Sequence, residues 1–132
     1  MNQLLTDKLF SEFPELFRGR KEPVKGKLMA LGFVCGDGWF DIIYNLSKDI
    51  TDYAKINNLE PFPKAFEVKQ KFGGLVFYLV QPVDNTIYNL TRKAQDASYK
   101  VCELCGSSDN VRGNKSGYKQ YLCDACRISS EN

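Results

Sequence analysis

The 132-residue sequence contains no histidine. This absence excludes serine or cysteine catalysis that uses an imidazole base, histidine-ligated metal sites and a histidine pH switch. Long apolar runs are also missing, so the sequence predicts no membrane-spanning helix, which needs about 18 or more consecutive apolar residues. The N-terminal residues carry Asp7 early and no long apolar segment, which is unlike a secretory signal. We therefore expect a cytoplasmic protein with reduced thiols.

The sequence also has little excess of one sign of charge. Eighteen Lys and Arg residues stand against sixteen Asp and Glu residues, a formal charge of +2. This excess is too small to mark the whole protein as a polyanion binder, so a phosphate or nucleic-acid site must rest on local clusters. The densest cluster is a Gly- and Pro-containing loop, residues 18–27, with the basic residues Arg18, Arg20, Lys21, Lys25 and Lys27. Two interpretations of this basic loop stay open, a solvated connector and a phosphate-contacting arm.

The hydrophobic pattern predicts an α+β fold, with a small hairpin-centred sheet packed by amphipathic helices and a C-terminal four-cysteine zinc finger. Residues 28–35 are apolar enough for a short buried strand. The apolar spacing from Trp39 to Ala54 predicts an amphipathic helix. A second helix is expected over residues 83–101, capped by Asp84 or its neighbour Asn85.

The domain organisation follows from the same pattern. A short helical stripe comes first and ends near Pro14. The helix expected over residues 83–101 leads directly into the first cysteine of the finger, with no linker between them. We therefore expect an α+β core domain over residues 1–101 and a zinc finger over residues 102–132 that is fused to it.

The hairpin is predicted by two β-prone segments, 64–72 and 75–80, on either side of Gly73-Gly74. A turn at these two glycines would place Phe72 opposite Leu75. The apolar face would then comprise Phe66, Val68, Phe72, Leu75, Phe77 and Leu79, with Gln70 among them. The opposite face would comprise Glu67, Lys69, Lys71, Val76, Tyr78 and Val80.

Four of the five cysteines form a C-x2-C-x17-C-x2-C pattern, at Cys102, Cys105, Cys123 and Cys126. This spacing is typical of a tetrahedral zinc site, because two intervening residues let one tight turn direct both sulfurs at a single ion. Two disulfides or four free thiols are the alternatives. Four thiolates leave no open coordination position, so the Zn²⁺ would be structural and not catalytic. Cys35 stands apart, and we expect it to be a buried thiol with no histidine to activate it.

The cysteine segment resembles treble-clef zinc fingers, and its spacing is similar to the GATA-type finger. The segment from Tyr121 to Cys126 looks like the second cysteine pair of that family at the start of a helix. The resemblance covers about 25 residues. The Trp-Arg motif of that family is missing after Cys105, and no basic tail follows Cys126. Sequence-specific DNA binding is therefore unsupported.

A wider resemblance links three segments of the chain, Gly36-Asp37-Gly38-Trp39-Phe40, residues 68–78 (Val-Lys-Gln-Lys-Phe-Gly-Gly-Leu-Val-Phe-Tyr) and the paired C-x2-C motifs. Together they resemble a group of small phage and bacterial proteins with no settled activity. The resemblance implies a phage accessory protein. Small proteins of that kind often neutralise a host component, including the nucleotide signals used in defence.

The first of three functional hypotheses is a non-enzymatic binding protein for a small phosphorylated ligand, such as a nucleotide or a nucleotide-derived signal. Lys69 and Lys71 would hold phosphate beside Tyr78, which can stack on a base. Trp39 and Arg92 are candidates to complete this site, as is the basic loop of a second protomer in a homo-oligomer. In the structural alternative, the lysines only line an exposed sheet face and Trp39 anchors the core.

The second hypothesis is an interaction module that binds a host protein or a nucleic acid through the finger, at Tyr118, Lys119, Tyr121 and Arg127. The third is a metal-dependent nuclease. In it Glu67-Val68-Lys69 would hold a divalent ion with Asp37 or Asp41. This tripeptide is short enough to occur by chance, and one hairpin is less sheet than such nucleases contain. We therefore expect a protein that binds and does not catalyse.

Overall fold

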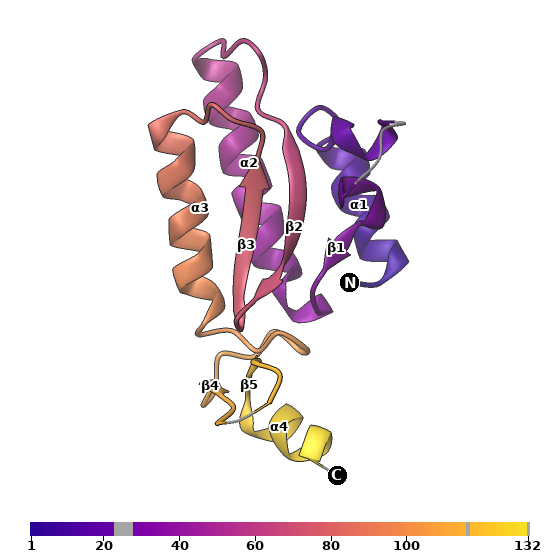
Figure 1. Cartoon of the computed structure of the whole chain (residues 1–132), viewed down its shortest axis with the longest axis vertical. Helices are drawn as coiled ribbons and strands as arrows, with labels where there is room; N and C mark the ends of the chain where they lie inside the picture. Colours follow the sequence, from indigo (N-terminus) through magenta and orange to yellow (C-terminus); the bar gives the residue numbers. More distant parts are fainter. Residues whose placement is uncertain (23–27, 116, 132) are drawn as a thin grey trace.

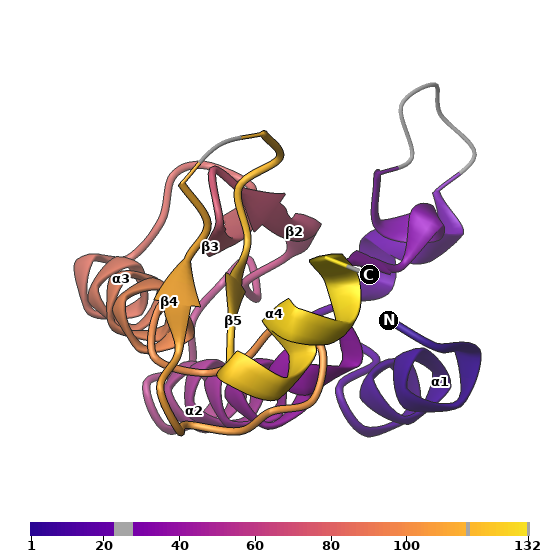
Figure 2. The ribbon, with the colours of Figure 1, turned by 90° about the horizontal axis from the view of Figure 1, so that it is seen from below.

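The core of the fold is a three-stranded sheet in the order β1-β2-β3, seen in a computed structural model that describes residues 1–22, 28–115 and 117–131. β1 (Phe33–Val34) runs parallel to β2 (Ala65–Lys71), and β3 (Gly74–Leu79) runs antiparallel to it. α2 (Phe40–Ile56) covers one face of the sheet, and α3 (Asn85–Ser98) lies beside β3 (Figures 1 and 2). Among the described residues, no helix lies on the other face of the sheet (Figure 2). These elements confirm the α+β class.

The two long helices form where the apolar spacing predicts them. α2 buries Ile43, Leu46 and Ile50 on one face, at the i, i+3 and i+7 positions that share a helix side. α3 begins after Asp84, whose carboxylate accepts hydrogen bonds from the amides of Thr86 and Ile87, as the capping prediction requires. Each large side chain buried in this way contributes about 2 kcal/mol to the stability of the fold.

The N-terminal segment packs on the β1 side of the sheet. α1 (Gln3–Glu12) is capped by the Asn2 side chain, which accepts from the amide of Leu5. Three short 3₁₀ turns follow along the chain, η1 (Arg18–Lys21), η2 (Leu28–Leu31) and η3 (Asp37–Trp39). No helix among the described residues is long and apolar enough to cross a bilayer.

The strand expected over residues 28–35 is wrong for most of its length. η2 occupies Leu28–Leu31, and only Phe33 and Val34 pair with β2. Gly32 separates the two elements with φ +79°, a left-handed conformation that breaks the extended chain. The apolar run therefore supplies a 3₁₀ turn that buries Met29, followed by a two-residue strand.

The hairpin forms, but its turn lies one residue earlier than the sequence predicts. Lys71 pairs with Gly74, so the two turn residues are Phe72 and Gly73, with φ +52° and φ +88°. Two positive φ angles define a type I′ turn. Phe72 consequently leaves the expected apolar face and is 80% exposed. The register shift is two residues, so Val68 still shares a face with Phe77, and that part of the prediction holds.

A bulge in β2 moves a second aromatic off the expected apolar face. The ladder shifts between Ala65 and Glu67, which leaves Phe66 as the extra residue. Phe66 is 38% exposed and stacks on Tyr78, with ring centroids 5.8 Å apart. Its expected core position is taken by Ala65, which is fully buried.

The C-terminal segment sits at the hairpin-turn end of the core (Figure 1). It contains a small antiparallel pair, β4 (Arg112–Gly113) with β5 (Tyr121–Leu122), and then α4 (Asp124–Glu131). We call this segment, from Cys102 onward, the finger, and the preceding part the core. A second, small cluster of buried residues lies inside the finger, formed by Cys102, Leu122 and Cys123.

Candidate metal centre and binding groove

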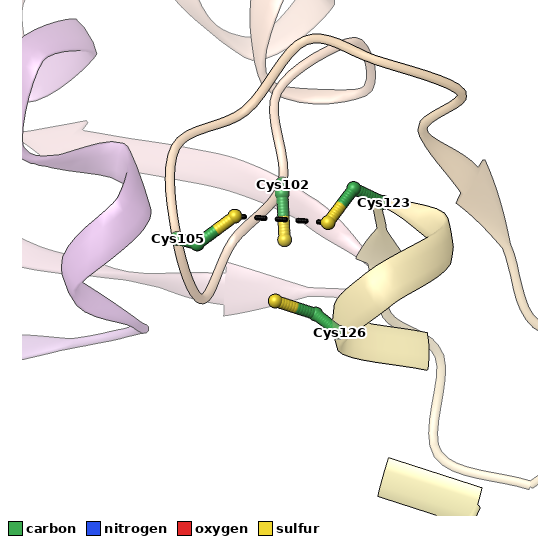
Figure 3. Close-up of side chains that lie close together, drawn as sticks. All are labelled: Cys102, Cys105, Cys123 and Cys126. Carbon is green, nitrogen blue, oxygen red and sulfur yellow. Dashed lines mark hydrogen bonds between the residues drawn. The ribbon is translucent and has the colours of Figure 1, made fainter. Parts of the chain in front are cut away.

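The four cysteines of the finger converge on one point. Cys102 and Cys105 lie on the turn that follows α3, Cys123 precedes α4, and Cys126 lies in the first turn of α4. Their side chains point toward one another (Figure 3), and all four Sγ atoms lie within 4.8 Å of one another. Among the described residues, this is the only group of three or more Cys, His, Asp or Glu side chains placed to share a metal ion.

The spacing of the sulfurs fits a metal better than a disulfide. Cys105 Sγ and Cys123 Sγ are 3.6 Å apart, and all five cysteines are free thiols. A tetrahedral Zn²⁺ with bonds of about 2.3 Å holds its sulfurs about 3.8 Å apart, whereas a disulfide needs about 2.05 Å. The four cysteines therefore form a candidate metal site.

The finger also provides groups that stabilise thiolates. Burial raises the pKa of Cys102, but backbone hydrogen bonds at Cys123, Cys105 and Leu104 outweigh it and lower that pKa to about 7. Hydrogen bonds with the neighbouring thiols instead raise the pKa of Cys126 to about 12. In these hydrogen bonds one thiol keeps its proton while its neighbour loses it. A bound dication would stabilise all four thiolates together.

The metal candidate is joined to the core through the Gly36-Asp37-Gly38 turn. The amide of Gly38 donates to the carbonyl of Glu103, 2.8 Å away. A Cβ on Gly38 would lie 2.1 Å from the carbonyl oxygen of Cys102, so only glycine allows this approach. Trp39, fully buried, donates its indole N–H to the carbonyl of Val101 at 3.1 Å.

Glu103, between the first two cysteines, is a buried charged residue that the sequence prediction missed. It is 4% exposed, and its carboxylate accepts from the Gly36 amide at 3.0 Å and from the Gln70 amide group at 3.5 Å. Gln70 also donates to the carbonyl of Lys119 at 2.7 Å. The available signal for this contact was Gln70, a polar residue on an otherwise apolar strand face. Its side chain points toward the finger.

The hairpin turn makes the second contact with the finger. A Cβ on Gly73 would lie 2.8 Å from the ring of Tyr121, and a Cβ on Gly74 would lie 2.5 Å from the Tyr99 hydroxyl. Tyr99 and Tyr121 themselves pack edge to face, with centroids 5.0 Å apart. The glycine pair therefore allows two tyrosines to pack against the backbone of the turn.

Three of the five expected ligand-binding residues line one groove. It lies between β3 and α3 and has a volume of about 370 Å³. Lys71 and Tyr78 come from the hairpin wall, and Arg92 comes from the helix wall. Trp39 is buried in the core and is not part of the groove. Lys69 does not line it either, and its ammonium lies 3.4 Å from the Glu67 carboxylate.

Each wall of this groove presents a cation next to a tyrosine. Lys71 Nζ lies 3.5 Å from the Tyr78 hydroxyl, and Arg92 donates to the Tyr88 hydroxyl at 3.1 Å. The Arg92 guanidinium also lies 5.9 Å from the centre of the Tyr88 ring. Tyr88 was missed by the sequence prediction, although its i, i+4 spacing to Arg92 was a usable signal.

A second pocket, of about 400 Å³, is lined mainly by residues 59–64 and 79–84. The loops in these two segments lie at the end of the core away from the finger (Figure 1). Apolar side chains and prolines make up most of its wall, and Arg18 lies at its edge. The Arg18 guanidinium donates to the carbonyls of Phe62 at 2.7 Å and Pro63 at 3.1 Å. Arg18 is therefore bonded to main-chain acceptors, and Lys64, the other cation of the pocket wall, pairs with Glu22.

The basic loop is described only in part. Arg20 donates to the carbonyls of Pro14 and Phe17 and lies over the Phe10 ring. Arg20 therefore connects η1 to α1, and Arg18 connects η1 to the loop before β2. Lys21 is exposed. Lys25 and Lys27 lie outside the described residues.

The structure also shows where residues of the interaction-module and nuclease hypotheses lie. Tyr118 is 71% exposed on the finger, whereas Tyr121 packs on Tyr99 and Arg127 pairs with Asp124. The Asp37 carboxylate accepts from the amide and the side chain of Asn2. Among the described residues, Glu67 belongs to no group of three or more acidic, Cys or His side chains that share a metal position.

Comparison with known proteins adds no family to these findings. No family model matches the chain, and the searches of curated proteins and of solved structures found no match. Within the fold, the Gly36–Phe40 turn contacts the first cysteine pair, and β2 of the hairpin reaches Glu103 through the Gln70 side chain.

Proposed function

We propose that this chain is a non-enzymatic binding protein, stabilised by a structural Zn²⁺, that captures a small phosphorylated ligand. The observation that carries the proposal is the groove between β3 and α3, where Lys71, Tyr78 and Arg92 come together from separate elements. Cations that flank aromatic rings suit a nucleotide, because phosphate is held by charge and a base is held by stacking.

Zn²⁺ is the metal that the donor set favours. Four cysteine sulfurs in a tetrahedral arrangement select Zn²⁺ or an iron–sulfur centre, and the turn–hairpin–helix order around them supports the resemblance to treble-clef fingers. All four positions are protein ligands, so the ion would hold the finger on the core and perform no chemistry. Such a site belongs in a reducing compartment such as the cytoplasm.

The resemblance to small phage proteins supplies a biological role for this binding. A phage accessory protein that holds a nucleotide signal would lower its free concentration in the host. Capture requires affinity and no turnover, and the groove supplies cations and aromatic rings for that affinity.

Isothermal titration calorimetry of the zinc-loaded protein against mono-, di- and cyclic nucleotides tests the proposal. We expect at least one binder with a submillimolar Kd. Arg92→Gln and Lys71→Gln should each weaken binding by about tenfold, the value of one charge-assisted hydrogen bond. Lys93→Gln is the matched control, because Lys93 is exposed on α3 outside the groove. A panel with no submillimolar binder would overturn the proposal.

Native mass spectrometry of freshly purified protein tests the metal and the oligomeric state in one measurement. We expect one Zn²⁺ per chain and a co-purified ligand mass if the affinity is high. A chain mass without metal, or with an iron–sulfur cluster, contradicts the structural zinc.

A further inference from the structure

One wall of the groove between β3 and α3 is formed by the main chain of β3. In the sheet order β1-β2-β3, β3 lies at the edge, and the side of β3 that faces away from β2 faces α3 (Figure 2). An edge strand presents one row of N–H and C=O groups that its sheet does not use. Five consecutive residues of β3, from Leu75 to Leu79, line the groove.

Two hydrogen bonds fix which residues point outward. The amide of Val80 donates to the carbonyl of Lys64, on the β2 side. The amide of Leu75 donates to the Ser98 hydroxyl on α3 at 2.9 Å, on the opposite side. Because the direction alternates along a strand, Phe77 and Leu79 direct their N–H and C=O groups to the same side as Leu75.

Side-chain burial agrees with this assignment. Phe77 and Leu79 are 6% and 5% exposed, with side chains in the hydrophobic core, yet both residues line the groove. What they contribute to the groove wall is therefore main chain. Among the hydrogen bonds that involve the described residues, none outside the sheet engages the backbone of Phe77 or Leu79.

The free edge is too short for an added peptide strand. Ser98 already occupies the amide of Leu75, and Tyr99 packs against Gly74 at that end of the groove. Only two outward-facing residues remain, whereas a typical strand has about five or six residues. A small planar group with a donor beside an acceptor matches the C=O of Phe77 followed by the N–H of Leu79.

We propose that the groove recognises the base of its ligand through the main chain of β3, and that the ligand is a nucleotide with an amino-substituted base, adenine or cytosine. The C=O of Phe77 accepts from the exocyclic amino group, and the N–H of Leu79 donates to the adjacent ring nitrogen. Lys71 and Arg92 are left for the phosphate. This inference rests on the proposed function, since it concerns the same groove.

Matched nucleotides test this base recognition by titration calorimetry. The 1,N6-etheno derivative of AMP and the 3,N4-etheno derivative of CMP keep the phosphate and an aromatic ring but lack the amino donor. We expect AMP or CMP to bind at least about tenfold more tightly than its etheno derivative and than ribose 5-phosphate. Equal affinity for a nucleotide, its etheno derivative and ribose 5-phosphate overturns main-chain base recognition and leaves phosphate capture standing. No binding of AMP or CMP overturns the recognition of adenine or cytosine, whereas the proposed function itself is decided by the full panel of mono-, di- and cyclic nucleotides.

Amide NMR of the ¹⁵N-labelled full chain gives a readout at the residue concerned. Saturation with AMP or CMP should shift the Leu79 amide downfield and slow its hydrogen exchange, as a new hydrogen bond requires. The Val80 amide, already bonded to Lys64, is the internal control and should change little. Binding that leaves the Leu79 amide unchanged overturns the proposal.

Discussion

The amide of Gly38 donates to the carbonyl of Glu103 across 2.8 Å, and this bond joins two segments that lie 65 positions apart in the sequence. Glu103 lies between the first two cysteines of the candidate metal site, and Gly38 lies two residues before the start of α2. The candidate metal site and the core are therefore joined through backbone contacts. Breaking this backbone bond should affect both parts of the molecule.

Replacement of Gly38 by alanine should destabilise the fold by about 3 kcal/mol, because the new Cβ would meet the Cys102 carbonyl and the finger must move. Gly117→Ala is the control. Gly117 has φ +79° but open space around it, so this substitution should cost only about 1 kcal/mol of backbone strain. Urea denaturation of both variants measures the difference. Equal losses would contradict a steric role for Gly38.

Removal of the metal should be visible in the fluorescence of Trp39. This is the only tryptophan of the chain, and its indole N–H is bonded to Val101, next to Cys102. Chelation under reducing conditions should disorder the finger, expose the indole and shift its emission to the red, with recovery when Zn²⁺ is returned. Cys123→Ser should show the shifted emission without chelator, whereas Cys35→Ser should behave as the native protein. An emission spectrum that is insensitive to chelation would contradict the coupling.

Replacement of Glu103 by alanine should cost about 1–3 kcal/mol, because the Gly36 amide and the Gln70 side chain lose their buried acceptor. Glu103→Gln keeps one acceptor oxygen and should cost less. Thermal unfolding of the two variants, with zinc content measured in parallel, separates packing from metal binding. Full zinc occupancy with a lowered Tm is the expected result for both.

The parts of the fold that the sequence predicted are those set by local pattern. The apolar period of α2, the Asp84 cap of α3 and the paired C-x2-C spacing each depend on residues close together in the chain. The α+β class and the candidate metal site follow from these signals alone.

The missed features depend on contacts between distant residues. Gly74 looks like a turn residue, but it is the first residue of β3, where Tyr99 packs against it, and the turn residues are Phe72 and Gly73. Trp39 had two predicted roles, ligand binding and core anchor, and the bond from its indole N–H to the Val101 carbonyl places it in the core. The groove likewise needs the spatial meeting of β3 and α3, which sequence spacing does not encode.

Cys35 should be unreactive toward alkylating reagents in the native protein at neutral and mildly alkaline pH. Burial is the largest cause that raises its pKa to about 12; the N-terminal ammonium group opposes this shift, and the charges of Glu103 and Asp37 add to it. The neutral thiol is favoured below that pKa, so the thiolate that attacks alkylating reagents is scarce at pH 8. Iodoacetamide at pH 8 should therefore leave Cys35 unmodified while the protein is folded and zinc-loaded, and modify it after unfolding in urea. Peptide mass spectrometry locates the label, and Cys35→Ser identifies the peptide. Cys35 is half-buried rather than fully buried. Alkylation of Cys35 at pH 8 in the folded protein, at the rate of a free thiol, would contradict its raised pKa.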